Sequence, residues 1–330
     1  MFRNEPEKTK DFFDRKDSND SELNRKMWVA LNFTEGIGPK MFHSLLDRFG
    51  SPAKVFEAST KALTSVHGIG DKTARKIKKT DPFTVIDDIL SQMDEDTSII
   101  TIAEEDDQYP ENLRSISDAP PVMFIKGSIE KHDNRSVAIV GSRNCSDRGK
   151  NIAFNLGKEF SERGWTVVSG FAKGIDTSGH VGALEGGGRT LAVFGSGINI
   201  VHPSKNRNLV EQVIKRGAIL SELSPNVPPR GTHLMARDRI ISGLSCGVIV
   251  VEASENSGTM DTAERAQKQE RKIFTVDLDR AGNQTLLNDK QTHPISPVSP
   301  DVDQICSILN RSLAQQSKPD SKQPSLLKFD

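Results

Sequence analysis

Three glycine-rich loops in this sequence carry residue types that hold phosphate groups. They are residues 141–143 (GSR), 169–176 (SGFAKGID) and 254–259 (SENSGT). Glycines let backbone N–H groups approach an anion, and hydroxyl and cationic side chains add further donors. Each loop alone could equally serve only to turn a strand into a helix or to cap that helix. Together they predict an anion site with the candidates Gly141, Ser142, Arg143, Ser169, Gly170, Lys173, Ser257, Gly258 and Thr259.

A fourth segment, residues 230–239 (RGTHLMARDR), contains three arginines and a histidine. These residues are Arg230, His233, Arg237 and Arg239. A planar guanidinium binds phosphate oxygens in pairs, which suits the arginines to a nucleotide or nucleic-acid ligand. The alternative is that they pair with aspartates and hold the domain together. The segment therefore adds four candidates to the predicted site.

The elements that position these loops follow a strand–helix alternation that begins at Ser136. Short Val- and Ile-rich segments alternate with amphipathic ones of about 10–17 residues, a pattern typical of a parallel sheet. The predicted fold class is α/β, a Rossmann-like, doubly wound, mostly parallel sheet. Its ligands bind outside the carboxyl ends of the strands, where the loops lie. The predicted strands are residues 136–141, 166–170, 190–197, 218–222, 247–253 and 272–277.

A small all-α domain of the helix–hairpin–helix (SAM-like) type is predicted over residues 25–80. Gly36-Ile37-Gly38 and Gly68-Ile69-Gly70 each lie between two amphipathic segments, and basic residues follow the second. Such a module contacts either DNA or another protein. The remaining predicted divisions are a disordered arm (1–24), a connecting segment (81–135), the extended Rossmann-like domain (136–312) and a disordered tail (313–330).

The overall charge of the chain restricts the kind of nucleic-acid site that it can carry. The 330 residues carry a net charge of −1, and the sequence pI is about 6.7. Residues 131–245 nevertheless contain 16 Lys and Arg against 9 Asp and Glu, so a nucleic-acid site would be a local groove.

The cysteines Cys145, Cys246 and Cys306 show no disulfide framework and no metal-binding spacing, which favours the reducing cytoplasm. No apolar run approaches the roughly 18–20 residues that cross a bilayer. We expect no membrane contact, no metal and no cofactor.

Several motifs, taken in order, give the chain a specific resemblance. The sequence is similar to the DprA (Smf) family of bacterial DNA-processing proteins from about residue 23 to 309. The motifs that carry it are YPENLRSISDAPPVMFIKG (109–127), GSR (141–143), SGFAKGID (169–176) with His180, LAVFGSGINIVHPSKNRNL (191–209), ILSE (219–222), ARDRIISGLS (236–245) and VVEASENSGTMDTA (250–263).

The resemblance implies a non-catalytic protein that binds single-stranded DNA, forms a homodimer and loads RecA onto incoming DNA in natural transformation. It implies phosphate contacts at Arg143, Arg230, Asn206 and the loop Ser257-Gly258-Thr259. The sequence departs from the family where Arg237-Asp238-Arg239 replaces a frequent Arg-Asn-Arg triplet. His233 lies near the position at which members of the family can carry a Phe that stacks on a base.

Two other functions remain as alternatives. The first is a nucleotide-sensing module of the phage-defence type. The second is a hydrolase of nucleoside monophosphates, whose relatives carry an Arg and a Gly-Thr loop like Arg239 and Gly258-Thr259 here. Those enzymes place a catalytic Glu three residues after the loop, where this chain has Thr262. Without that carboxylate the sugar cation and the attacking water lose their stabiliser, which disfavours the enzyme.

Overall fold

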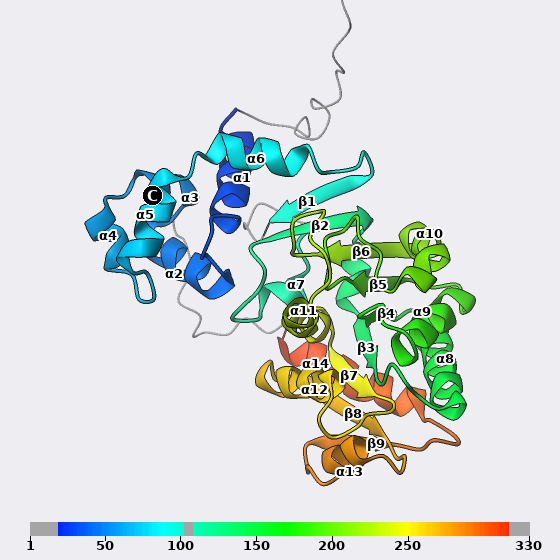
Figure 1. The fold of residues 1–330 in the computed structure, drawn as a ribbon. Helices are drawn as coiled ribbons and strands as arrows, with labels where there is room; N and C mark the ends of the chain where they lie inside the picture. The colour runs from blue at the N-terminus through cyan, green and yellow to red at the C-terminus, as the bar shows by residue number, and fades with distance from the viewer. Residues whose placement is uncertain (1–18, 102–107, 317–330) are drawn as a thin grey trace, which may run out of the picture. The chain divides into compact units, whose positions relative to one another are not determined.

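The computed structural model describes residues 19–101 and 108–316 (Figure 1). The chain divides into two compact units, and the boundary falls between Gln92 and Met93. No helix in the described part of the chain is long and apolar enough to cross a membrane.

The first unit is all-helical and contains the two predicted hairpins. Gly36 and Gly68 adopt φ of 93° and 85°, which glycine tolerates best, and each turn leads directly into the next helix. The apolar faces pack around Phe42 and Leu45, with the Trp28 ring 5.1 Å from that of Phe42. The predicted helix–hairpin–helix domain is confirmed. Its helices are α1 (Asn19–Asn32), α2 (Pro39–Phe49), α3 (Pro52–Glu57), α4 (Thr60–Thr64), α5 (Asp71–Lys79) and α6 (Pro82–Leu90).

The second unit is built on one nine-stranded sheet of order β1-β2-β6-β5-β4-β3-β7-β8-β9. The strands from β6 to β9 in this order are parallel, whereas β1 and β2 pair antiparallel at one edge. The predicted mostly parallel α/β sheet is thus confirmed. Its strands are β1 (Thr97–Thr101), β2 (Val122–Gly127), β3 (Ser136–Val140), β4 (Thr166–Ser169), β5 (Thr190–Val193), β6 (Gly217–Ser221), β7 (Gly247–Val250), β8 (Lys272–Val276) and β9 (Thr292–Ile295).

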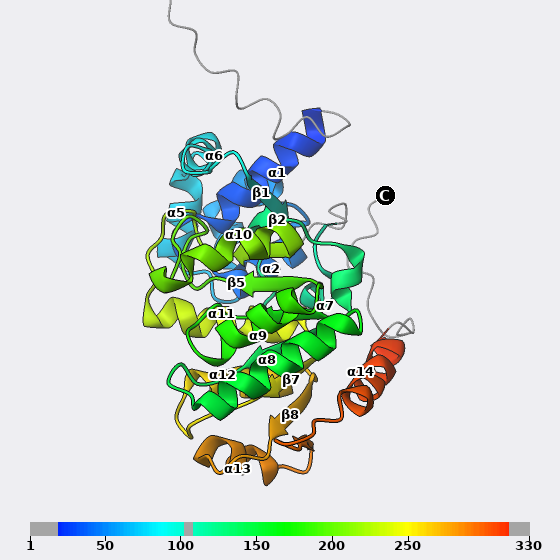
Figure 2. The same cartoon turned by 90° about the vertical axis from the view of Figure 1, so that its right-hand side faces the viewer.

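Helices cover both faces of this sheet, as a doubly wound fold requires (Figures 1 and 2). Alternate residues of β3 point to opposite sides: Val137 and Ile139 pack with α8 and α9, whereas Ala138 and Val140 pack with α11 and α12. One face carries α8 (Asp147–Glu162), α9 (Ile175–Glu185), α10 (Arg207–Arg216) and α14 (Val302–Gln316). The other carries α7 (Glu111–Arg114), α11 (Gly231–Leu244) and α12 (Gly258–Lys268), and α13 (Ala281–Leu287) precedes β9.

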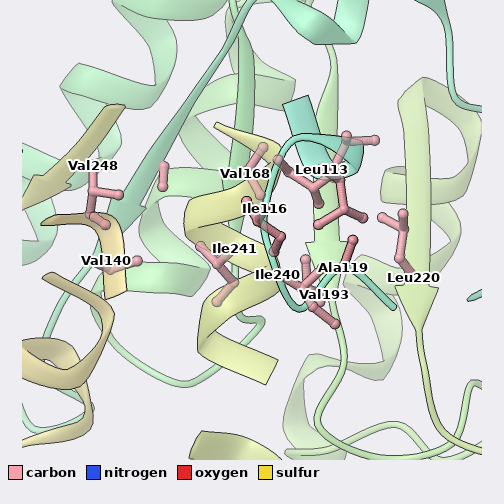
Figure 3. Close-up of a cluster of buried hydrophobic side chains, with 14 of the residues drawn as sticks. Leu113, Ile116, Ala119, Val140, Val168, Val193, Leu220, Ile240, Ile241 and Val248 are labelled. Atoms are coloured by element: carbon pink, nitrogen blue, oxygen red, sulfur yellow. The ribbon is translucent and has the colours of Figure 1, made fainter. Parts of the chain in front are cut away.

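The core beneath α11 fixes the position of that helix. In Figure 3, Ile240 and Ile241 lie between Val140 on one side and Val193 and Leu220 on the other. Full burial of such a side chain contributes on the order of 1.5–3 kcal/mol, so α11 is held firmly against the strands. The helix therefore presents its first turns at a fixed place.

Three predicted divisions differ from the structural elements. The predicted connecting segment, residues 81–135, supplies α6 to the first unit and strands β1 and β2 to the sheet of the second. Helix α1 begins within the predicted arm, and α14 continues four residues beyond position 312. Residues 1–18 and 317–330 of the predicted arm and tail lie outside the described residues.

Candidate functional site

A cavity of about 400 Å³ opens where the sheet reverses its direction of growth. The chain winds from β3 through β4 and β5 to β6, then returns to place β7 on the other side of β3. Loops from β3 and β7 therefore diverge at one point, which is where open α/β sheets bind ligands. We call this space the switch-point cavity. Its lining is Val140, Gly141, Ser142, Arg143, Asn144, Ala172, Asp176, Gly231, Leu234, Met235, Arg237, Asp238, Ile241, Ser257, Gly258, Thr259 and Thr262.

The loop after β3 forms one wall and is held rigidly. Ser142 donates its backbone N–H to the carbonyl of Glu252 at 2.7 Å, and the buried Glu252 carboxylate accepts from the Ser146 hydroxyl at 2.7 Å. A Cβ on Gly141 would lie 2.5 Å from Ile175, so only glycine fits this packing. Arg143 is exposed and forms no hydrogen bond or ion pair with any residue that the structure describes. Its guanidinium is free to bind an anion.

Two helix N-termini meet at the same cavity. Gly231 and Leu234 come from the first turn of α11, while Ser257, Gly258 and Thr259 begin α12. Neither N-terminus has a side-chain cap, because Arg230 caps nothing and the Ser257 hydroxyl donates to Ser254 O instead. Uncapped N–H groups and the positive end of the helix dipole favour anions. The geometry thus suits a phosphate.

Arg237 reaches the cavity but is engaged inside the protein. Its side chain is 5% exposed and donates to the carbonyls of Gly170 and Val193 and to the Asp238 carboxylate. A Cβ on Gly170 would collide with this guanidinium. The Asp176 carboxylate holds the same loop by accepting from the Gly170 and Ala172 N–H groups. Arg237 therefore fixes the loops after β4 and β5.

Two carboxylates line the cavity beside Arg237. Burial raises the pKa of Asp176, although Arg237 and backbone donors oppose the rise. Burial likewise raises the pKa of Asp238 to about 6, against the attraction of Arg237. One part of the cavity is thus acidic, and a phosphate belongs at the part beside Arg143.

Arg239 points away from this space. It is 5% exposed, and its guanidinium forms a two-pronged pair with Glu222, with Nη1–Oε1 at 2.7 Å and Nη2–Oε2 at 2.6 Å. It also donates to the Asp118 carbonyl at 3.0 Å. This matches the alternative in which an arginine of the segment serves the fold.

Two further candidates are internal. The Ser169 hydroxyl donates to Ile139 O at 2.6 Å, and the buried Asn206 amide donates to Phe171 O and to the Thr177 hydroxyl. Both hold the loop after β4, where Phe171 has a φ of 61°. His180 is also buried, and burial lowers its pKa to about 3.

Three further candidates, besides the internal ones, also lie outside the cavity lining. Lys173 and Arg230 are exposed and have no side-chain partner among the described residues. Arg230 directly precedes Gly231 of the cavity. His233 is 3.3 Å from Pro228 O through Nδ1 and contributes nothing to the lining.

Sequence reasoning missed the apolar and acidic part of the cavity. Leu234 and Met235 line it, and Met235 is 52% exposed, an unusual state for a large apolar side chain. The spacing of Met235 and Asp238, three residues apart after a helix start, was the available signal, because such residues share one helix face. Thr262, at the position of the hydrolase glutamate, donates its hydroxyl to Gly258 O. No cluster of His, Cys, Asp and Glu within the described ranges could hold a metal ion.

Comparison with known proteins decides the family. The model of the family described as DNA recombination-mediator protein A matches residues 99–305, and a model of SAM-like helix-hairpin-helix tandems matches residues 31–80. The chain belongs to the family of DNA recombination-mediator protein A.

Relatives within this family agree in sequence and in fold. The chain is 33% identical over 257 residues to Protein Smf of Synechocystis, which covers 76% of this chain and 63% of that protein. It thus spans less than two thirds of that relative. The structure of DNA processing protein A from Streptococcus pneumoniae has a TM-score of 0.69 and 28% identity, and covers 85% of this chain and 96% of that one. A structure of DNA processing protein A from Helicobacter pylori is described as showing a unique single-stranded DNA binding mode. It has a TM-score of 0.57 and 25% identity, and the match covers 65% of this chain and 96% of that one.

Proposed function

We propose that the second unit binds single-stranded DNA and holds its phosphates at the switch-point cavity. One observation carries this proposal: two uncapped helix N-termini and the unpaired Arg143 border a single cavity. Three independent sources of positive potential at one point favour a polyanion. The single-stranded DNA binding described for the Helicobacter pylori relative supports the same choice.

The candidate residues divide into contacts and supports under this proposal. Arg143, Arg230 and Lys173 bind phosphates with their side chains, with His233 beside them at the edge. Backbone and hydroxyl donors come from Gly141, Ser142, Ser257, Gly258 and Thr259. The interior residues Ser169, Gly170, Asn206, Arg237 and Arg239 hold these donors in place through the contacts described above.

Membership of the family supports a proposal for the biological role. We infer that the protein protects incoming single-stranded DNA in the cytoplasm, acts as a homodimer and loads RecA onto the strand during natural transformation. No bond-breaking step is assigned to the chain, because Thr262 replaces the carboxylate that the hydrolase mechanism needs. Purified protein should therefore speed the assembly of RecA on DNA coated with single-strand-binding protein. Equal assembly rates with and without the protein would contradict the loading role.

A nucleotide-sensing function is the second candidate, because about 400 Å³ is also enough for one nucleotide. Titration with oligonucleotides of increasing length separates the two functions. Affinity that grows over several nucleotides supports a DNA site, since each added phosphate contact strengthens binding. Binding of a mononucleotide as tight as that of a 20-mer would instead identify a sensor.

A further inference from the structure

The acidic part of the switch-point cavity needs an explanation that phosphate binding does not give. Asp238 lines the cavity and is 7% exposed. Its Oδ1 accepts from Arg237 Nε at 3.1 Å. Its Oδ2 lies beside Gly258 of α12, 3.8 Å from where a Cβ on that glycine would be, and accepts no hydrogen bond from any described residue. One carboxylate oxygen is therefore an open acceptor.

Charges around Asp238 exclude an anion from this part of the cavity. Asp176 from α9 and Asp261 from α12 add negative potential. Arg237 on its own helix is shared with two carbonyls, and Arg265 of α12 is paired with Asp261 at 2.7 Å. The third cation of the surroundings is Arg143, which lines the same cavity from the loop after β3. A group that reaches Asp238 must be neutral or cationic and must offer a donor.

The neighbouring surface is apolar and suits a flat ring. Leu234, Met235 and Ile241 of α11 line the cavity together with Asp238. A thioether such as that of Met235 makes favourable contacts with aromatic rings. A ring bearing an amino group thus finds an apolar wall and an acceptor in one place.

We propose that the switch-point cavity takes one base of the bound strand and that Asp238 selects bases with an exocyclic amino group. This inference rests on the proposed binding of single-stranded DNA. Cytosine, adenine and guanine can donate an amino N–H to a carboxylate, and an Asp–cytosine N4 contact is a known form of base readout. Uracil and thymine carry a carbonyl oxygen at position 4 in place of the amino group of cytosine, and that oxygen repels the carboxylate.

The test compares oligo-deoxycytidine with oligo-deoxyuridine of 20 nucleotides, because the two bases differ only at the amino and carbonyl positions and the adjacent ring nitrogen. At pH 7.5 we expect the wild-type protein to bind the cytosine strand roughly fivefold more tightly or better. In Asp238→Asn the ratio should fall to near one. Asp261→Asn is the matched control, because it removes the same charge nearby from a residue outside the lining, and its ratio should stay at the wild-type value.

Protonation offers a second readout on the uracil strand alone. Since the pKa of Asp238 is about 6, lowering the pH from 8 to 5.5 should strengthen binding of the uracil strand in the wild type more than in Asp238→Asn. Equal and tight binding of both strands by the wild type overturns the base selection while leaving DNA binding intact. Equal ratios in Asp238→Asn and the wild type also overturn it. Failure to bind either strand overturns the proposed function as well.

Discussion

Replacement of Arg239 by alanine should destabilise the fold, because it removes an internal ion pair and not a phosphate contact. The Arg239 side chain is 6% exposed and satisfies both oxygens of Glu222, whose side chain is only 17% exposed, as well as the Asp118 carbonyl. Removal leaves a largely buried carboxylate without its partner, which costs about 3–5 kcal/mol of the free energy of unfolding. The pair also joins α11 to the end of β6, so its loss loosens the helix that borders the cavity.

Urea denaturation followed by circular dichroism measures this change through the midpoint and the slope. Arg143→Ala is the matched control, because that exposed arginine has no partner among the described residues and should unfold like the wild type. The double replacement Arg239→Met with Glu222→Leu should recover part of the loss, since no charge is left buried. The reasoning is refuted if Arg239→Ala keeps the wild-type midpoint and loses about tenfold in DNA affinity.

The remaining predictions concern the cavity itself. Arg143→Ala and Arg230→Ala should each weaken single-strand binding by about tenfold, and the double variant should depart from additivity in fluorescence anisotropy titrations. Asp238→Asn should stabilise the protein by up to about 3 kcal/mol at pH 8 and by about half of that at pH 5. The reason is that the pKa of Asp238 is about 6 in the folded protein against the ordinary 3.8, so the ionised carboxylate becomes more costly as the pH rises. Urea denaturation at both pH values measures this difference. An equal change in the free energy of unfolding at pH 8 and pH 5 would contradict this prediction. Gly258→Ala should leave the melting temperature unchanged, because its Cβ would meet only Asp238 Oδ2 at 3.8 Å, while binding weakens by roughly threefold.

The sequence was sufficient to predict the parallel sheet and the sheet edge at which the glycine-rich loops meet. Alternation of short apolar segments with amphipathic ones defines strands such as β3 and β7, and glycine loops at their carboxyl ends can only meet at the sheet edge. The antiparallel pairing of β1 with β2 and of β2 with β6 could not be predicted, because β2 and β6 are far apart in the chain. No local pattern specifies such a partner.

The roles of individual arginines could not be read from the sequence for the same reason. Arg143, Arg237 and Arg239 are equally basic, yet only Arg143 is free. The partners that engage Arg239 and Arg237 lie up to 121 residues away along the chain, at Asp118 and Gly170 among others. Composition predicts a cation at a site, whereas only the tertiary structure shows which cation already has an internal acceptor.

Salt dependence of DNA binding tests the central claim most directly. A 20-nucleotide single strand and a duplex of the same length are titrated at several salt concentrations, with the wild type and with Arg143→Ala. We expect tighter binding of the single strand and a log–log salt slope that is less steep in Arg143→Ala by about 0.7, the value of one lost phosphate contact on a single strand. Equal affinity for the duplex, or an identical slope in Arg143→Ala, would contradict a phosphate site at the switch-point cavity.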